Sequence, residues 1–155
     1  MTAEQSVQPR IDRPGKWFSW DEFGCNDNVG TPYPVDLRAS NGVRLGRELD
    51  RIRERVGGPV HLTSVYRTWA HHAGIYASLR PKQTAPPNSY HLQGMAADVA
   101  CPAKLDWLQF VALIKAVANE DDSRIRYVKL YRPPHGGLAH IDIRPTAKLV
   151  VEYLS

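Results

Sequence analysis

Residues 138–144 restrict the possible folds of this chain more than any other segment, because polar and apolar side chains alternate through them. A period of two is typical of a β-strand, whose successive side chains point to opposite faces of a sheet. One predicted face is apolar and consists of Ala139, Ile141 and Ile143. The other face carries Leu138, His140, Asp142 and Arg144. A histidine and two charged groups on one face of an otherwise apolar strand favour a functional site over a plain surface.

Helices are predicted from caps and from apolar spacing, over residues 20–23, 45–56, 69–79 and 107–119. The second has one apolar face, formed by Leu45, Leu49, Ile52 and Val56, and it ends at a Gly-Gly-Pro sequence. The other three begin after the capping residues Ser19, Thr68 and Asp106. Strands are predicted over residues 60–65, 95–100, 125–131, 138–144 and 148–154. Residues 26–34 and 80–88 read as loops, and residues 133–137 as a turn.

Helices early in the chain, followed by strands and hairpins, are typical of an α+β fold. The length of 155 residues is usual for one domain. We therefore predict a single compact domain over residues 17–155, with a small, mainly antiparallel sheet flanked by helices. Residues 1–16 hold few apolar side chains, which predicts a disordered leader.

Composition excludes some classes of protein. The chain has 43% hydrophobic and 23% charged residues, and no apolar run approaches the length of about 18 residues that a membrane span needs. The net charge is +4, but residues 44–55 mix basic with acidic side chains, as a solvated helix face does. Aromatic and basic residues are not interleaved, so we expect no nucleic-acid partner. Cys25 and Cys101 are expected to be free or structural.

A second polar segment, residues 89–98, can meet the strand at 138–144. His91 and Asp98 are seven residues apart, and Gly94 permits the loop after His91 to fold tightly onto the next strand. Ala96 shares a strand face with Asp98 and leaves room beside it. Together with His140, two imidazoles and one carboxylate form a common catalytic zinc set with a fourth position left for water.

The order of these segments resembles one family of enzymes. Residues 89–98 read Ser-x-His-x-x-Gly-x-Ala-x-Asp, and roughly forty residues later 140–142 read His-x-Asp. Upstream, residues 63–68 look like that family's strand ending in Ser-Gly-Tyr-Arg, and residues 19–23 and 57–59 look like its N-terminal elements. Over roughly residues 17–145 the chain thus resembles the M15 peptidases, which include zinc D-Ala-D-Ala carboxypeptidases and phage L-alanyl-D-glutamate endolysins.

The resemblance implies that His91, Asp98 and His140 bind one zinc ion per chain, in the compact fold shared by DD-peptidases and hedgehog-type domains. It also implies that Arg67 binds a substrate carboxylate, which suits the planar guanidinium. A structural ion pair of Arg67 with Asp98 or Asp142 remains the alternative. Further substrate contacts are expected from Ser89 and Tyr90. His71 and His72 are expected to be structural or on the surface, and His61 is expected to pack within the strand at 60–65. Cys101 is left open as an extra ligand.

One position departs from the family pattern. Many M15 peptidases carry Glu or Asp three residues before the last zinc histidine, as general base, and this chain has Gly137 there. Two residues could replace the acid. His135 could shuttle protons or stabilise the oxyanion from the turn. Asp142 could act as base, or it could orient a ligand histidine or Arg67. We prefer His135.

The resemblance therefore predicts a zinc metallopeptidase that hydrolyses a peptide bond in peptidoglycan stem peptides. The bond could be D-Ala-D-Ala, L-alanyl-D-glutamate or another stem-peptide bond. The alternative is a non-catalytic module that keeps zinc but only binds wall peptide or a partner protein. We expect the protein to be a monomer. Residues 1–16 contain no apolar stretch of signal-peptide length. We therefore expect the protein to reach the bacterial wall as a phage lysin, on a virion or by another export route.

Overall fold

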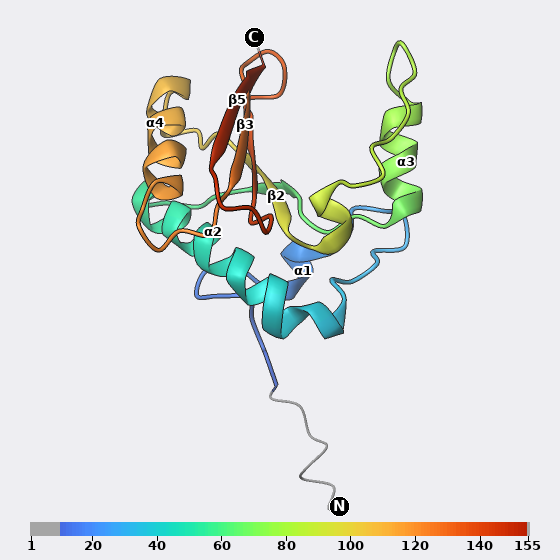
Figure 1. Ribbon diagram of the computed structural model, residues 1–155, viewed down its shortest axis with the longest axis horizontal. Helices are drawn as coiled ribbons and strands as arrows, with labels where there is room; N and C mark the ends of the chain where they lie inside the picture. Colours follow the sequence, from blue (N-terminus) through green and yellow to red (C-terminus); the bar gives the residue numbers. More distant parts are fainter. Residues whose placement is uncertain (1–9, 155) are drawn as a thin grey trace, which may run out of the picture.

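The computed structural model describes residues 10–154, which form a five-stranded mixed sheet with helices around it (Figure 1). The strands are β1 (Leu62–Ser64), β2 (Ala96–Ala100), β3 (Tyr127–Tyr131), β4 (Leu138–Asp142) and β5 (Val150–Leu154). Their order across the sheet is β1-β2-β4-β3-β5, and all neighbouring pairs are antiparallel except β3 and β5, which are parallel. The α-helices are α1 (Trp20–Phe23), α2 (Val43–Val56), α3 (Trp69–Ala77) and α4 (Trp107–Ala118). The predicted α+β class is confirmed.

The helices begin and end where the local chemistry requires it. The Asp106 carboxylate accepts a hydrogen bond from the Gln109 amide at 2.8 Å, and the Gln109 side chain accepts one from the Asp106 amide at 2.9 Å. This reciprocal capping box satisfies two donors that the first turn of α4 leaves free. Thr68 caps α3 by accepting from the His71 amide. Helix α2 ends at Gly57, whose φ of 70° is left-handed.

One face of the sheet forms the core. Its inward side chains are at most 1% exposed, and they are Ala97, Val99, Val128, Leu130, Ala139 and Ile141. Helices α2 and α4 contact each other, and their buried side chains join the same apolar cluster. In Figure 1, α4 and α3 lie on opposite sides of β3 and β5. The alternation of residues 138–144 thus gives the predicted result, because Ala139 and Ile141 are buried in the core while His140 faces the other way.

Some boundaries differ from the predictions. The strand expected over residues 60–65 is paired only over β1, and the strand expected to continue to Arg144 ends at Asp142. Beyond Asp142 the chain turns, with the Thr146 amide donating to the Arg144 carbonyl. Strand β5 begins later than expected and is parallel to β3, so the sheet is mixed. Three short helical turns were not predicted: η2 (Val35–Leu37), η3 (Arg38–Gly42) and η4 (Tyr90–Gln93).

The segment before residue 17 divides into two parts. Residues 1–9 of the predicted leader lie outside the described residues. Residues 14–16 pack against α2, with Pro14 buried and the Lys16 amide donating to Asp50 at 2.8 Å. Gly46 lies so close to Pro14 that a Cβ there would meet its carbonyl oxygen. The packed part of the chain therefore begins before residue 17.

Three arginines of α2 have acidic partners. Arg47 and Arg51 both pair with Asp122, at 2.7 and 2.6 Å, and Arg55 pairs with Glu120. Exposed pairs of this kind each contribute roughly 0–1 kcal/mol. Within residues 10–154, no helix has both the length and the apolar character that crossing a bilayer requires.

Candidate metal centre

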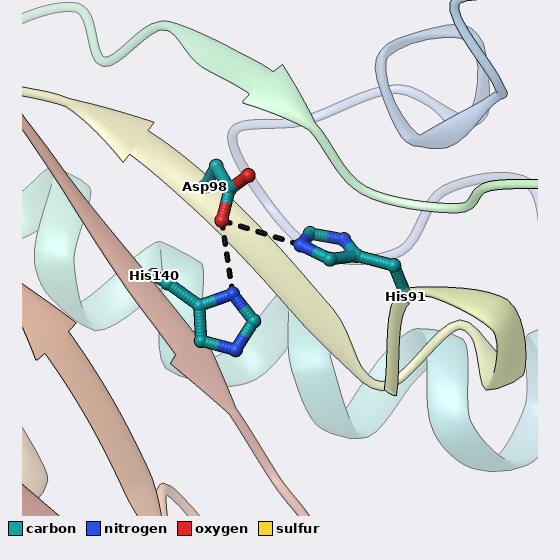
Figure 2. A group of neighbouring side chains, drawn as sticks. All are labelled: His91, Asp98 and His140. Atoms are coloured by element: carbon teal, nitrogen blue, oxygen red, sulfur yellow. Dashed lines mark hydrogen bonds and ion pairs between the residues drawn. The ribbon is translucent and has the colours of Figure 1, made fainter. Parts of the chain in front are cut away.

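Three side chains converge on the face of the sheet opposite the core. Asp98 on β2 and His140 on β4 are directly opposite each other in the antiparallel pair, so their side chains share a face. His91 approaches from η4, just before β2 (Figure 2). One ligand atom from each of the three lies within 4.8 Å of the others. The three residues that the motif singled out are thus brought together.

The turn that delivers His91 depends on Gly94. This residue ends η4 with a φ of 66°, a left-handed conformation that glycine adopts without strain. A Cβ at this position would lie 2.5 Å from the Tyr33 hydroxyl oxygen, and that hydroxyl donates to the Gly94 carbonyl at 2.8 Å. The requirement for glycine here is therefore both conformational and steric.

His91 points a lone pair at Asp98. Its Nδ1 lies 2.6 Å from the Val65 carbonyl oxygen, which can only accept, so Nδ1 carries the proton. In the neutral ring Nε2 is then an acceptor, yet it faces Asp98 Oδ1 at 3.2 Å. Burial lowers the pKa of His91 and outweighs the attraction of Asp98, which favours the neutral ring. Two acceptors that face each other at this distance favour a cation between them.

His140 repeats the arrangement with its nitrogens exchanged. Its Nε2 lies 2.9 Å from the Asp142 carboxylate, so that nitrogen donates, and Nδ1 faces Asp98 Oδ1 at 3.0 Å. Burial opposes charge on His140, but the hydrogen bond to Asp142 and the attraction of Asp98 outweigh it and raise the pKa of the ring. Burial likewise opposes charge on Asp98, but the attraction of His140 and His91 outweighs it and holds the pKa of its carboxyl below the ordinary value.

These partners are those expected around a metal ion. In metal sites a ligand histidine donates its second ring N–H to a carbonyl or a carboxylate, which fixes the tautomer and the ring orientation. His91 has the Val65 carbonyl for this purpose and His140 has the Asp142 carboxylate. Asp98 is 9% exposed and His91 is 3% exposed, so the group is nearly buried. The His91, Asp98 and His140 group could therefore hold a metal ion.

Arg67 forms the ion pair that the sequence left open as an alternative to substrate binding. Its Nη2 lies 3.1 Å from Asp98 Oδ2, and its Nε donates to the Ser64 hydroxyl at 2.9 Å. The remaining nitrogen, Nη1, lies 3.4 Å from His72 Nδ1. Each guanidinium nitrogen thus has a partner, and Arg67 fixes the Asp98 oxygen that does not face the histidines.

Asp142 lies behind His140. Its side chain is fully buried, and its two oxygens accept from Arg144 Nε and Nη2, both at 2.7 Å, as well as from His140. The Arg144 guanidinium lies against two aromatic rings, 3.9 Å from the Tyr127 centroid and 4.7 Å from that of Tyr90. Burial opposes ionisation of Asp142, but Arg144 and His140 outweigh it and lower the pKa of its carboxyl. Asp142 therefore positions His140 and offers no free oxygen for a base.

The other predicted site residues lie further out. His135 is exposed on the hairpin turn, and within residues 10–154 its side chain makes no hydrogen bond. Gly137 stands in the same turn, where its carbonyl accepts from the Cys101 amide at 2.9 Å. Ser89 is half-buried at the start of η4, and Tyr90 contributes its ring to the contact with Arg144.

The remaining histidines and the cysteines are separate from the group. His72 is fully buried, and its Nε2 lies 2.9 Å from the Pro86 carbonyl oxygen, so it ties α3 to the loop at 80–88. His61 is exposed. Both cysteines are free, and the Cys101 sulfur faces backbone carbonyl oxygens rather than the metal group.

Three residues of the same face were missed by the sequence interpretation. They lie on β3 and are Tyr127, Lys129 and Tyr131. The register places Lys129 directly opposite His140. The alternation of residues 127–131 could have identified them, because Val128 and Leu130 are buried while the other three residues are half-buried. This is the same pattern that drew attention to residues 138–144.

No protein-family model matches this chain, and no curated protein matches it.

Proposed function

We propose that this protein is a zinc metallopeptidase that hydrolyses a peptide bond in peptidoglycan stem peptides. The observation that carries the proposal is the convergence of His91 Nε2 and His140 Nδ1 on one oxygen of Asp98, with the second nitrogen of each ring already donating elsewhere.

Zinc suits this donor set. Two imidazoles and one carboxylate are a common catalytic zinc set, and nitrogen or oxygen ligands lie about 2.0–2.1 Å from the ion. Two such ligands at a tetrahedral angle are about 3.3 Å apart. The separations of Asp98 Oδ1 from His91 Nε2 and His140 Nδ1 are 3.2 and 3.0 Å. The three ligand atoms together lie within 4.8 Å of one another, so movements of about an ångström would bring the two imidazoles to zinc distance.

Zinc held here would supply Lewis acidity, which makes water acidic enough to attack at neutral pH and polarises the scissile carbonyl. The chain's own residues prepare the site for this chemistry. Arg67 holds the far oxygen of Asp98, and Asp142 keeps the His140 proton on Nε2. Tyr131 lies on the same face, and burial together with the charge of Asp98 raises the pKa of its phenol. Tyr131 thus keeps its proton at neutral pH and can donate a hydrogen bond to a developing oxyanion.

The substrate class rests on the motif resemblance. Peptidoglycan stem peptides contain the D-Ala-D-Ala and L-alanyl-D-glutamate bonds that the resembling enzymes cut. We infer action on such a peptide at the bacterial wall, by a monomer that needs neither nucleic acid nor a membrane span. Delivery as a phage lysin, on a virion or by another export route belongs to the same proposal.

A second function is favoured by one observation. Gly137 stands where many M15 peptidases carry a carboxylate, and Asp142 is fully occupied by Arg144 and His140. A protein of this kind could keep zinc and bind wall peptide without cutting it.

Purified peptidoglycan incubated with zinc-loaded protein separates the two functions. The peptidase releases new peptide fragments whose masses identify the bond, and the His140→Ala variant releases none. A matched control is His71→Ala, which removes an imidazole from α3 outside the metal group. Zinc-loaded protein that sediments with the wall but releases nothing would refute the peptidase and support the binding module.

A further inference from the structure

A row of polar side chains crosses the whole sheet on the metal-bearing face. The register pairs Ser64 with Asp98, Asp98 with His140, His140 with Lys129, and Lys129 with Glu152. Residues paired in this way share a face, with Cβ atoms about 5 Å apart. Lys129 is therefore the immediate neighbour of a metal-group histidine, on the side away from Arg67.

The Lys129 ammonium has no carboxylate partner within residues 10–154. Its cross-strand neighbour Glu152 instead accepts a hydrogen bond from the Tyr127 hydroxyl at 2.6 Å. The Nζ atom lies 5.3 Å from the centre of the Tyr131 ring. Lys129 is half-buried. The covered part shields its charge from water, and the exposed part leaves the charge available to a ligand.

Arg67 is the contrasting cation on the other side of the group. All three of its guanidinium nitrogens have partners, including an Asp98 oxygen at 3.1 Å. A substrate carboxylate that approached Arg67 would compete with Asp98 for that guanidinium. Lys129 offers a charge without such competition.

We propose that Lys129 binds a carboxylate of the substrate within about one residue of the scissile bond. The inference rests on the proposed function and deepens it, because it selects peptides with a free carboxylate beside the bond. A stem peptide offers two such groups, the α-carboxylate of its γ-linked D-glutamate and the carboxylate of its terminal D-alanine. Tyr127 and Tyr131 lie on either side of Lys129 along β3, on the same face of the sheet.

The test uses the zinc-loaded protein and four forms of the peptide L-Ala-γ-D-Glu-L-Lys-D-Ala-D-Ala. One form is free, one has its terminal carboxylate amidated, one has the D-Glu α-carboxylate amidated, and one has both amidated. Affinity is measured by calorimetry, or as KM where a peptide is cleaved. The variant Lys129→Met keeps the side-chain stem against Tyr131 and removes the charge. The matched control is Lys115→Met, because Lys115 also lies against a tyrosine ring, that of Tyr153, but on α4, which packs on the core face.

The wild type should bind the free peptide more tightly than the form that lacks the recognised carboxylate, by roughly tenfold to a hundredfold. Lys129→Met should lose this preference while it retains zinc, and Lys115→Met should keep it. The carboxylate whose amidation weakens binding to the wild type is the one that Lys129 binds. Lys129→Met with the wild-type preference, or a wild type that shows none, would overturn the inference.

The inference and the proposed function fail in different ways. A carboxylate preference that depends on Lys129, with no peptide cleaved and no wall fragment released, would support the carboxylate site and refute the peptidase. Cleavage of the peptide with a carboxylate preference that Lys129→Met does not change would support the peptidase and refute the carboxylate site.

Discussion

Replacement of Asp142 by Asn should weaken zinc binding more than any other change outside the three ligands. The Asp142 carboxylate accepts from His140 Nε2 at 2.9 Å and from two Arg144 nitrogens at 2.7 Å. An amide has one accepting oxygen and one NH₂ group that only donates, so it cannot accept all three of these hydrogen bonds. If the NH₂ group faces His140, that ring must carry its proton on Nδ1, the atom that faces Asp98.

The expected loss of zinc affinity is about 10- to 100-fold, or about 1.4–2.8 kcal/mol, as is usual for partners of a ligand histidine. The metal-free variant should also lose about 2–3 kcal/mol of unfolding free energy. This is less than for a fully buried pair, because the Arg144 side chain is 26% exposed. The comparison variant is Arg144→Met, which leaves Asp142 able to accept from His140 and should reduce zinc affinity less.

Zinc affinity is measured by competition with a chromophoric chelator, and stability by urea denaturation of the metal-free protein. At saturating zinc, Asp142→Asn should recover most of the rate of wall hydrolysis, because Asp142 positions His140 and does not act as base. Zinc affinity within twofold of the wild type would refute this role for Asp142. A rate that stays abolished at full zinc occupancy would restore Asp142 as a catalytic base.

Three further predictions concern other parts of the site. Gly94→Ala should destabilise the protein by about 2–4 kcal/mol, since a Cβ would lie 2.5 Å from the Tyr33 hydroxyl at a φ of 66°. Gly74 lies in the middle of α3 with open space around it, so Gly74→Ala should instead stabilise the protein by about 0.5–1 kcal/mol. If urea denaturation gave the two variants the same change in unfolding free energy, the requirement for glycine at residue 94 would be refuted. Zinc affinity should fall about tenfold per pH unit below the raised pKa of His140, because zinc must displace that proton, and should level off above it. Chelator competition at several pH values would contradict this if the affinity did not change with pH. His135→Ala should keep wall hydrolysis within about twofold, since the side chain is exposed on the turn; a large loss would return His135 to the mechanism.

Much of the fold could be predicted because it depends on local chemistry. The caps at Thr68 and Asp106 fix where α3 and α4 begin, and the spacing of apolar residues fixes the buried face of α2. The alternation around His140 predicted which side chains enter the core. The parallel pairing of β5 with β3 could not be predicted in this way, because it depends on which sheet edge remains free after the other strands have paired.

The site shows the same division. The motif resemblance singled out His91, Asp98 and His140, and Gly94 accounts locally for how the turn brings His91 to the sheet. The partners of Arg67 depend on the register of β1 with β2, which no spacing fixed. The same holds for Lys129, whose place beside the metal group appears only once β3 and β4 are aligned.

The central claim is that His91, Asp98 and His140 together bind one zinc ion. Its most direct test is a titration of metal-free, folded protein with zinc, alongside the His140→Ala variant and the His71→Ala control. We predict one tightly bound zinc per chain in the wild type and in His71→Ala, and a loss of that tight binding in His140→Ala. A folded wild type that binds no zinc, or a His140→Ala variant that binds it as tightly as the wild type, would contradict the account.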